Sequence, residues 1–187
     1  VALNCVSNGK LLREGPFDDI WIQPAAGDAG GALGAAHFCW HQLLENPRTG
    51  TGKDVQKGSL LGPKYTTAEC KATADKHGAK YKVFDDEAKL LDFVSGQMAD
   101  GKVIGWMHGR MEYGPRALGA RSIIGDPRNV KMQSIMNLRI KFRESFRPFA
   151  PCVLRERASE YFEMSPQHEN PYMLHVAPVL EKHRTKL

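Results

Sequence analysis

A glycine-rich segment at residues 24–36 constrains the fold more than any other part of this sequence. It reads PAAGDAGGALGAA and places glycines at positions 27, 30, 31 and 34. The apolar residues 20–23 before it predict a β-strand, and apolar residues at near-helical spacing after it predict a helix over residues 27–44. A strand, a glycine turn and a helix in this order leave backbone N–H groups at the helix start, where a phosphate or another anion can bind.

Asp28 lies inside this turn and has two uses that the local sequence leaves open. As the helix N-cap it would stabilise the helix by about 1 kcal/mol. As a carboxylate ligand it could hold a hard or borderline metal ion beside a nucleotide. Local sequence favours the cap. No Gly-Lys-Ser/Thr follows the turn, so it is not a phosphate loop of that type.

Positive charge is concentrated in residues 110–147. This segment carries nine basic and three acidic residues, a net +6, while the whole chain is only +5. Seven of the nine basic residues are arginines, and a solvated basic face usually favours lysine. Structural ion pairs have few acidic partners here. We therefore favour an anion pocket over ion pairs, a solvated face or a nucleic-acid surface.

Two parts of this segment carry the basic residues. Arg110, Arg116 and Arg121 punctuate a loop that contains several glycines, which can turn guanidinium groups toward one point. Farther along, residues 138–147 alternate between basic and apolar, which predicts one basic and one packed face.

The remaining pattern alternates helices and strands, which predicts an α/β or α+β fold. Helices are expected at residues 4–14, 66–77, 85–99 and 129–140. Strands are expected before residue 3 and at residues 81–84, 103–107, 150–154 and 172–179. The Gly-, Pro- and Lys-rich residues 46–63 predict a linker or an exposed loop.

Length and composition exclude several classes of protein. At 187 residues and 42% hydrophobic content, the chain is long and apolar enough to form one domain or two small ones, which excludes overall disorder. No run of 18 apolar residues is present, so we expect no membrane partner. The four cysteines form no C-x-x-C pair, which predicts reduced thiols in the cytoplasm rather than a zinc site. The chain does not begin with Met and shows no signal peptide, which suggests a cut or processed chain.

Four motifs together resemble one family. The segments VALNCVSNGKLL, PAAGDAGGALGAA, GRMEYGPRALGARSI and FRPFAP are similar to those of the O-carbamoyltransferases of nodulation and antibiotic biosynthesis, and the resemblance runs from Val1 to about Val176. It implies that residues 1–50 are the tail of an actin-like domain. Residues 51–187 would then be a YrdC-like α/β domain, with the fold incomplete at both ends.

The resemblance also implies a reaction and its residues. The YrdC-like part would form carbamoyladenylate from carbamoyl phosphate and ATP, and the actin-like part would transfer the carbamoyl group to a hydroxyl with the help of iron or another divalent metal. Asp28 matches the metal ligand. Three basic residues match the positions that grip carbamoyl phosphate or the adenylate: Arg116, Lys141 and Arg147. The expected cofactor-binding residues are Asn4, Gly27, Gly30, Gly31, Arg110, Arg121 and Arg143.

The same resemblance sets the expected partners. The acceptor would be a hydroxyl-bearing oligosaccharide or antibiotic, and the rest of a longer parent chain would complete the enzyme. We expect the chain alone to be inactive, because half of the metal site and the acceptor pocket would lie outside it. The alternative is a basic module that binds double-stranded RNA, whose affinity would fall steeply with salt, whereas a pocket would prefer carbamoyl phosphate to plain phosphate.

Overall fold

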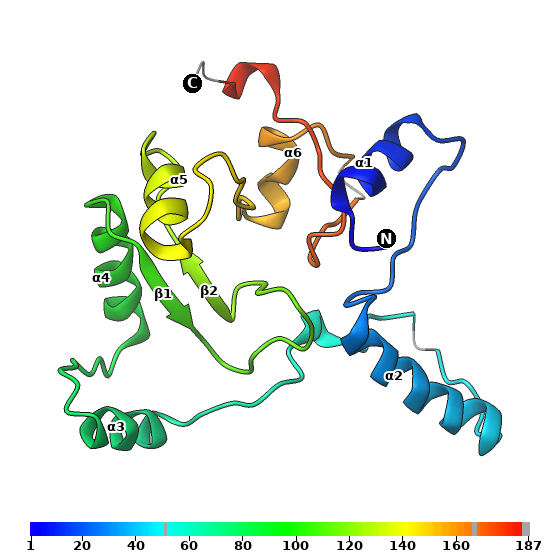
Figure 1. Ribbon diagram of the computed structural model, residues 1–187, viewed down its shortest axis with the longest axis horizontal. Helices are drawn as coiled ribbons and strands as arrows, with labels where there is room; N and C mark the ends of the chain where they lie inside the picture. Colours follow the sequence, from blue (N-terminus) through cyan, green and yellow to red (C-terminus); the bar gives the residue numbers. More distant parts are fainter. Residues whose placement is uncertain (51, 166–167, 185–187) are drawn as a thin grey trace. The chain divides into compact units, whose positions relative to one another are not determined.

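The computed structural model describes residues 1–50, 52–165 and 168–184, which combine helices with one small sheet in an α+β arrangement (Figure 1). Two compact units divide the chain. The first unit is formed by Val1–Gly62, Glu112–Leu118 and Cys152–Leu187, and the second by Pro63–Met111 and Gly119–Pro151. The first unit therefore contains residues from both sides of the boundary expected at residue 50.

Helix α1 (Cys5–Glu14) is joined to the C-terminal part of the first unit. Asn4 caps the helix, because its side chain accepts a hydrogen bond from the Ser7 N–H at 3.1 Å. The buried Asn8 amide donates to the carbonyls of Ala2 at 2.8 Å and Leu174 at 2.7 Å. Figure 1 shows the C-terminal chain passing beside α1. These bonds make residues 1–8 and 174 one local structure.

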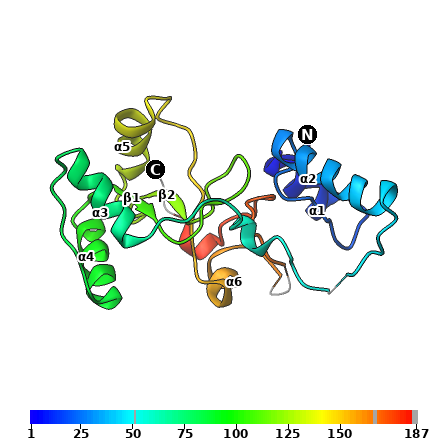
Figure 2. The same ribbon diagram turned by 90° about the horizontal axis from the view of Figure 1, so that it is seen from below.

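Helix α2 (Asp28–Phe38) continues without a break into the π-helix η1 (Cys39–Leu43) (Figure 2). No residue of α2 is buried, and Phe38, Trp40 and Leu43 are largely exposed. The expected helix over residues 27–44 is confirmed. The remaining elements of the first unit are short: η2 (Lys57–Ser59), η4 (Arg155–Arg157), α6 (Ala158–Tyr161) and η5 (Glu181–His183).

The second unit is organised around an antiparallel pair of strands. Strands β1 (Ile104–Met107) and β2 (Arg121–Ile124) pair with Ile104 opposite Ile124. Helices α5 (Met132–Ile135) and η3 (Met136–Lys141) follow, and Met132 and Met136 are buried against Gly125 at the end of β2. Helices α3 (Thr67–Lys76) and α4 (Glu87–Ala99) precede the pair of strands.

The expected helices are confirmed, but most of the expected strands are wrong. The segments 20–23, 81–84, 150–154 and 172–179 contain no strand, and Val1–Leu3 is a turn. Within these segments the described pairing is a single isolated bridge between Phe162 and Val179. Short apolar stretches predict burial, but a strand also needs a continuous ladder of backbone hydrogen bonds to a neighbour, and in the described residues these stretches form isolated bonds at most. The strand at 103–107 is confirmed as β1, whereas β2 occupies a region that was expected to be loop.

Within the described residues, the structure contains no helix that is both long enough and apolar enough to cross a bilayer.

Candidate functional site

Two of the sequence motifs meet inside the first unit. The Tyr113 hydroxyl donates a hydrogen bond to the Ala29 carbonyl, 84 residues away in the sequence. The neighbouring Gly114 lies so close to Ala25 that a Cβ on the glycine would be 2.7 Å from the alanine Cβ. The Tyr113 N–H also donates to the Ser59 carbonyl at 2.5 Å. Residues 112–118 therefore support the glycine-rich turn directly.

The turn itself depends on one glycine more than on the others. Ala25 has a positive φ of 57°, and its carbonyl accepts a hydrogen bond from the Gly30 N–H at 2.9 Å. A Cβ on Gly30 would lie 2.4 Å from that carbonyl oxygen, so only glycine fits. By contrast, a Cβ on Gly27 or on Gly31 would meet nothing within 4 Å. The backbone at these two glycines is open to a ligand.

Asp28 is the first residue of α2, and the N-cap position belongs to Gly27, which has no side chain to cap with. The interpretation of Asp28 as the N-cap is therefore wrong. Its exposed carboxylate instead lies in the first turn, where negative charge interacts favourably with the helix dipole. Among residues 1–50, 52–165 and 168–184, no group of three or more His, Cys, Asp or Glu could hold a metal ion.

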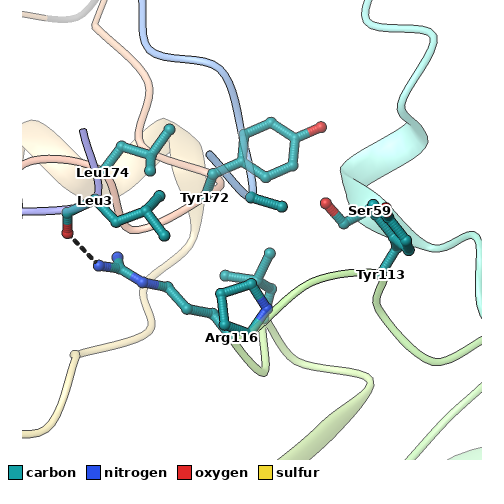
Figure 3. A pocket seen from close by; sticks show the side chains of 9 residues that line it. Leu3, Ser59, Tyr113, Arg116, Tyr172 and Leu174 are labelled. Atoms are coloured by element: carbon teal, nitrogen blue, oxygen red, sulfur yellow. Dashed lines mark hydrogen bonds between the residues drawn. The ribbon is translucent and has the colours of Figure 1, made fainter. Parts of the chain in front are cut away.

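Arg116 lies at the centre of a small junction in the first unit (Figure 3). Its Nη2 donates to the Leu3 carbonyl at 2.6 Å, and its Nη1 donates to the Met173 carbonyl. The cavity beside it has a volume of about 10 Å³, which is room for about one water molecule. The guanidinium thus ties the N-terminal turn to residues 172–174 and is held in a fixed orientation.

Glu112 closes the loop that carries Arg116. It is only 5% exposed, and its Oε1 accepts a hydrogen bond from the Leu118 N–H at 2.7 Å. A buried carboxylate needs such donors, because burial without them disfavours its charge. Sequence reasoning missed Glu112 and Tyr113, although both lie within the quoted motif MEYGPRALG.

Tyr172 closes the other side of the junction. Its hydroxyl donates to the Asp54 carboxylate and accepts from the Gly58 N–H at 3.1 Å. Burial, together with the Asp54 carboxylate, raises the pKa of Tyr172 to about 12. The hydrogen bond from Tyr172 in turn lowers the pKa of Asp54. Figure 3 shows Tyr172 and Ser59 on the wall of the same junction. No sequence pattern pointed to Tyr172 or Asp54, which lie 118 residues apart.

The three arginines expected in one loop are divided between the two units. Arg116 belongs to the first unit, whereas Arg110 and Arg121 belong to the second. There the backbone of Arg110 forms an isolated antiparallel β-bridge with that of Lys64. Arg121 is a residue of β2 and pairs with Met107 of β1.

Three further basic residues lie on a loop of the second unit, residues 141–147, which we call the basic loop: Lys141, Arg143 and Arg147. Lys141 ends η3, and Phe142 turns the chain with left-handed backbone angles of φ 50° and ψ 50°. The expected period-two alternation over 138–147 is therefore wrong, because this stretch is part helix and part turn. At the far end, the exposed Arg147 pairs with Glu144 at 3.0 Å. Lys141 is exposed as well, so an anion can approach both ends of the basic loop.

Arg143 points back from the middle of the basic loop. Its Nε donates to the Asn137 Oδ1 at 2.7 Å, and its guanidinium lies over the Phe149 ring at 4.9 Å. The pKa of Glu144 is lowered by hydrogen bonds from its own backbone N–H and from Arg147. Sequence reasoning grouped Arg143 with the cofactor-binding residues, and its described contacts are those of a residue that shapes the loop.

Comparisons with known proteins match an N-terminal and a C-terminal part of this chain. A family model described as Carbamoyltransferase C-terminus matches residues 95–187, and one described as Carbamoyltransferase N-terminus matches residues 1–37. An uncharacterized protein of Synechocystis is 57% identical over all of this chain and 30% of its own length. The nodulation protein NolNO of Sinorhizobium fredii is 43% identical over all of this chain and 27% of its own length. The nodulation protein U of Azorhizobium caulinodans is 34% identical over 99% of this chain and 30% of its own length. The chain thus spans about 30% of the length of such relatives.

Proposed function

The chain belongs to the carbamoyltransferase family, and we propose that it is part of a longer enzyme that transfers a carbamoyl group to a hydroxyl. The acceptor that we propose is an oligosaccharide, as the resemblance to the carbamoyltransferases of nodulation implies, and several relatives carry the name nodulation protein. In the proposed reaction, carbamoyl phosphate, ATP and water give carbamoyladenylate, phosphate and pyrophosphate. The acceptor hydroxyl then attacks the carbamoyl carbon, and AMP leaves.

The basic loop is the part of this chain that we assign to carbamoyl phosphate. Lys141 and Arg147 are exposed cations at its two ends, and cations offset the repulsion between two polyanionic substrates. Glu144 already accepts from Arg147, so the substrate phosphate would compete with this carboxylate. Arg116 belongs to the first unit, where two carbonyls fix the direction of its guanidinium, and its expected contact with the donor stays a prediction.

The glycine-rich turn is the part that we assign to the nucleotide. Its support by residues 112–118 is the observation that carries this assignment, since two motifs far apart in the sequence build one local structure. Open backbone at Gly27 and Gly31 suits the close approach of a phosphate to a helix start. Asn4 holds the start of α1, and its proposed contribution to the nucleotide site is indirect.

A metal ion completes the proposal only with ligands from beyond this chain. Asp28 offers one exposed carboxylate, which suits a divalent cation such as iron. The described residues supply no cluster around it. In the longer enzyme the metal would supply Lewis-acid chemistry at the transferred group.

Pyrophosphate release tests the proposal without knowledge of the acceptor. The full-length protein that contains this chain is incubated with ATP and carbamoyl phosphate, and a parallel reaction receives inorganic phosphate instead. We expect release that depends on carbamoyl phosphate, and a fall of about tenfold or more in Lys141→Ala and Arg147→Ala, since each removes a charge-assisted contact.

Lys71→Ala is the matched control, because Lys71 is an exposed lysine on α3 that takes no part in the proposed site. Release at the wild-type rate is expected for this variant. If carbamoyl phosphate has no effect on pyrophosphate release, the proposed function is wrong.

A further inference from the structure

Asn137 is the most deeply buried polar side chain of the second unit. It is 0% exposed, although it lies one residue after the buried Met136 in a helix that ends at the surface. A buried amide is costly unless its donors and acceptor are satisfied. Here they are: the Nδ2 group donates to the carbonyls of Ser145 at 2.9 Å and Arg147 at 2.8 Å. The Oδ1 atom accepts from the Nε of Arg143 at 2.7 Å.

All of these partners belong to the basic loop. The Arg143 N–H adds a further bond, to the Asn137 backbone carbonyl at 3.1 Å. Gln133, one helical turn earlier, donates from its Nε2 to the carbonyls of Phe146 at 3.2 Å and Arg147 at 3.1 Å. Two amide side chains from α5 and η3 thus clamp the backbone of the loop.

Hydrophobic burial does not hold this loop in shape. Phe142 is 85% exposed and Phe146 is 76% exposed, so neither ring is anchored in a core. Phe142 also has a left-handed backbone, which is unfavourable for a bulky residue unless surrounding contacts impose it. The side chain of Asn137 holds the residues that follow Phe142, and its backbone carbonyl accepts from the Phe142 N–H.

We propose that Asn137 is a positioning residue, whose side chain sets the basic loop in the shape that presents Lys141 and Arg147 to the phosphate of the carbamoyl donor. This inference rests on the proposed function. Asn137 holds the Arg147 carbonyl directly by a hydrogen bond. Lys141 lies one turn of helix after Asn137. Asn137 itself is buried, so we propose that it acts through the basic loop and not by contact with the substrate.

The test compares Asn137→Asp with the wild-type full-length protein. The aspartate keeps an acceptor for Arg143 but removes the Nδ2 donors, so its oxygen faces the carbonyls of Ser145 and Arg147. We expect the KM for carbamoyl phosphate in pyrophosphate release to rise about tenfold, since two hydrogen bonds are lost. The KM for ATP should change less than twofold. Amide hydrogen exchange in residues 142–147 should become faster.

Met132→Ala is the stability control. Met132 is buried in the same unit beside Gly125, and in the part of the chain that the structure describes no hydrogen bond joins its side chain to the basic loop. The Met132→Ala substitution lowers the stability of the protein because it leaves a cavity. A general loss of stability would raise the KM values for carbamoyl phosphate and for ATP together, or neither of them. We expect its KM for carbamoyl phosphate to stay within twofold of wild type at a temperature where both proteins are folded.

If Asn137→Asp does not fold, Gln133→Ala tests whether the amide side chains position the basic loop. Gln133 is exposed, so its removal leaves the core intact, and we expect a rise of two- to threefold in the KM for carbamoyl phosphate alone. Unchanged KM and unchanged exchange in the folded variants would overturn the role of Asn137 while leaving the proposed function in place. A wild-type protein without donor-dependent release would overturn both.

Discussion

Gly30 and Gly31 are neighbours in the sequence but have opposite surroundings. A Cβ on Gly30 would collide with the Ala25 carbonyl oxygen at 2.4 Å, whereas a Cβ on Gly31 would meet nothing within 4 Å. The glycine pattern alone gave both positions the same role in a nucleotide site. The structure separates a glycine that the turn requires from one that leaves the backbone open.

Gly30→Ala should lower the free energy of unfolding by about 1–3 kcal/mol, because the new methyl group must push a backbone carbonyl aside. Gly31→Ala should raise it by up to about 1 kcal/mol, since alanine is the better helix residue and its methyl group has space. Denaturant unfolding of the two variants measures both values. Equal effects would show that the turn is not built as described.

His175 should make stability depend on pH. Its Nε2 is buried and has no hydrogen-bond partner among the residues that the structure describes. Burial, with a smaller contribution from His168, lowers the pKa of His175, while Asp19 opposes the shift. Its contribution to stability is therefore complete above the unfolded-state pKa of about 6.5. It is lost as pH falls below that value, because the unfolded chain takes up the proton more readily.

The measurement is the melting temperature at pH 7.5 and at pH 5.5. We expect the wild-type protein to lose more stability between these two values than His175→Gln, which cannot take up a proton. An identical loss in both proteins would contradict the assignment to His175.

At the scale of elements, helices were predictable because their starts carry local signals. Asn4, Thr66 and Asp86 each cap a helix at the expected place. Strands depend on partners far along the chain, so the apolar segments 20–23 and 172–179 gave a false signal. The alternation of basic and apolar residues over 138–147 failed for a related reason, since a helix end followed by the turn at Phe142 produces the same pattern.

The capping box of α3 gives a prediction at this scale. The Thr66 hydroxyl accepts from the Glu69 N–H at 3.2 Å, and the Glu69 carboxylate accepts from the Thr66 N–H at 2.7 Å. Thr66→Ala should lower the free energy of unfolding by about 1 kcal/mol, whereas Thr66→Ser, which keeps the oxygen, should change it by less than half as much. Denaturant unfolding compares the two. An equal loss in both would show that the hydroxyl does not cap the helix.

For the whole molecule, the sequence predicted candidate site residues but not the contacts that hold them. Asp28, Gly30 and the basic residues were found from composition and motif. The contact between Tyr113 and Ala29 and the bond between Tyr172 and Asp54 join residues 84 and 118 positions apart, and no local pattern encodes them. Asn137 was passed over as one polar residue in an amphipathic stretch, since only the folded loop shows what its amide binds.

The most direct test of the central claim is pyrophosphate release by the full-length protein, measured as the concentration of carbamoyl phosphate is varied. Release that saturates with carbamoyl phosphate, is absent with inorganic phosphate, and falls at least tenfold in Lys141→Ala but not in Lys71→Ala is the predicted result. Two results would contradict the assignment of the donor site to the basic loop. One is a rate of pyrophosphate release that does not depend on carbamoyl phosphate, and the other is an unchanged rate in a variant that lacks both Lys141 and Arg147.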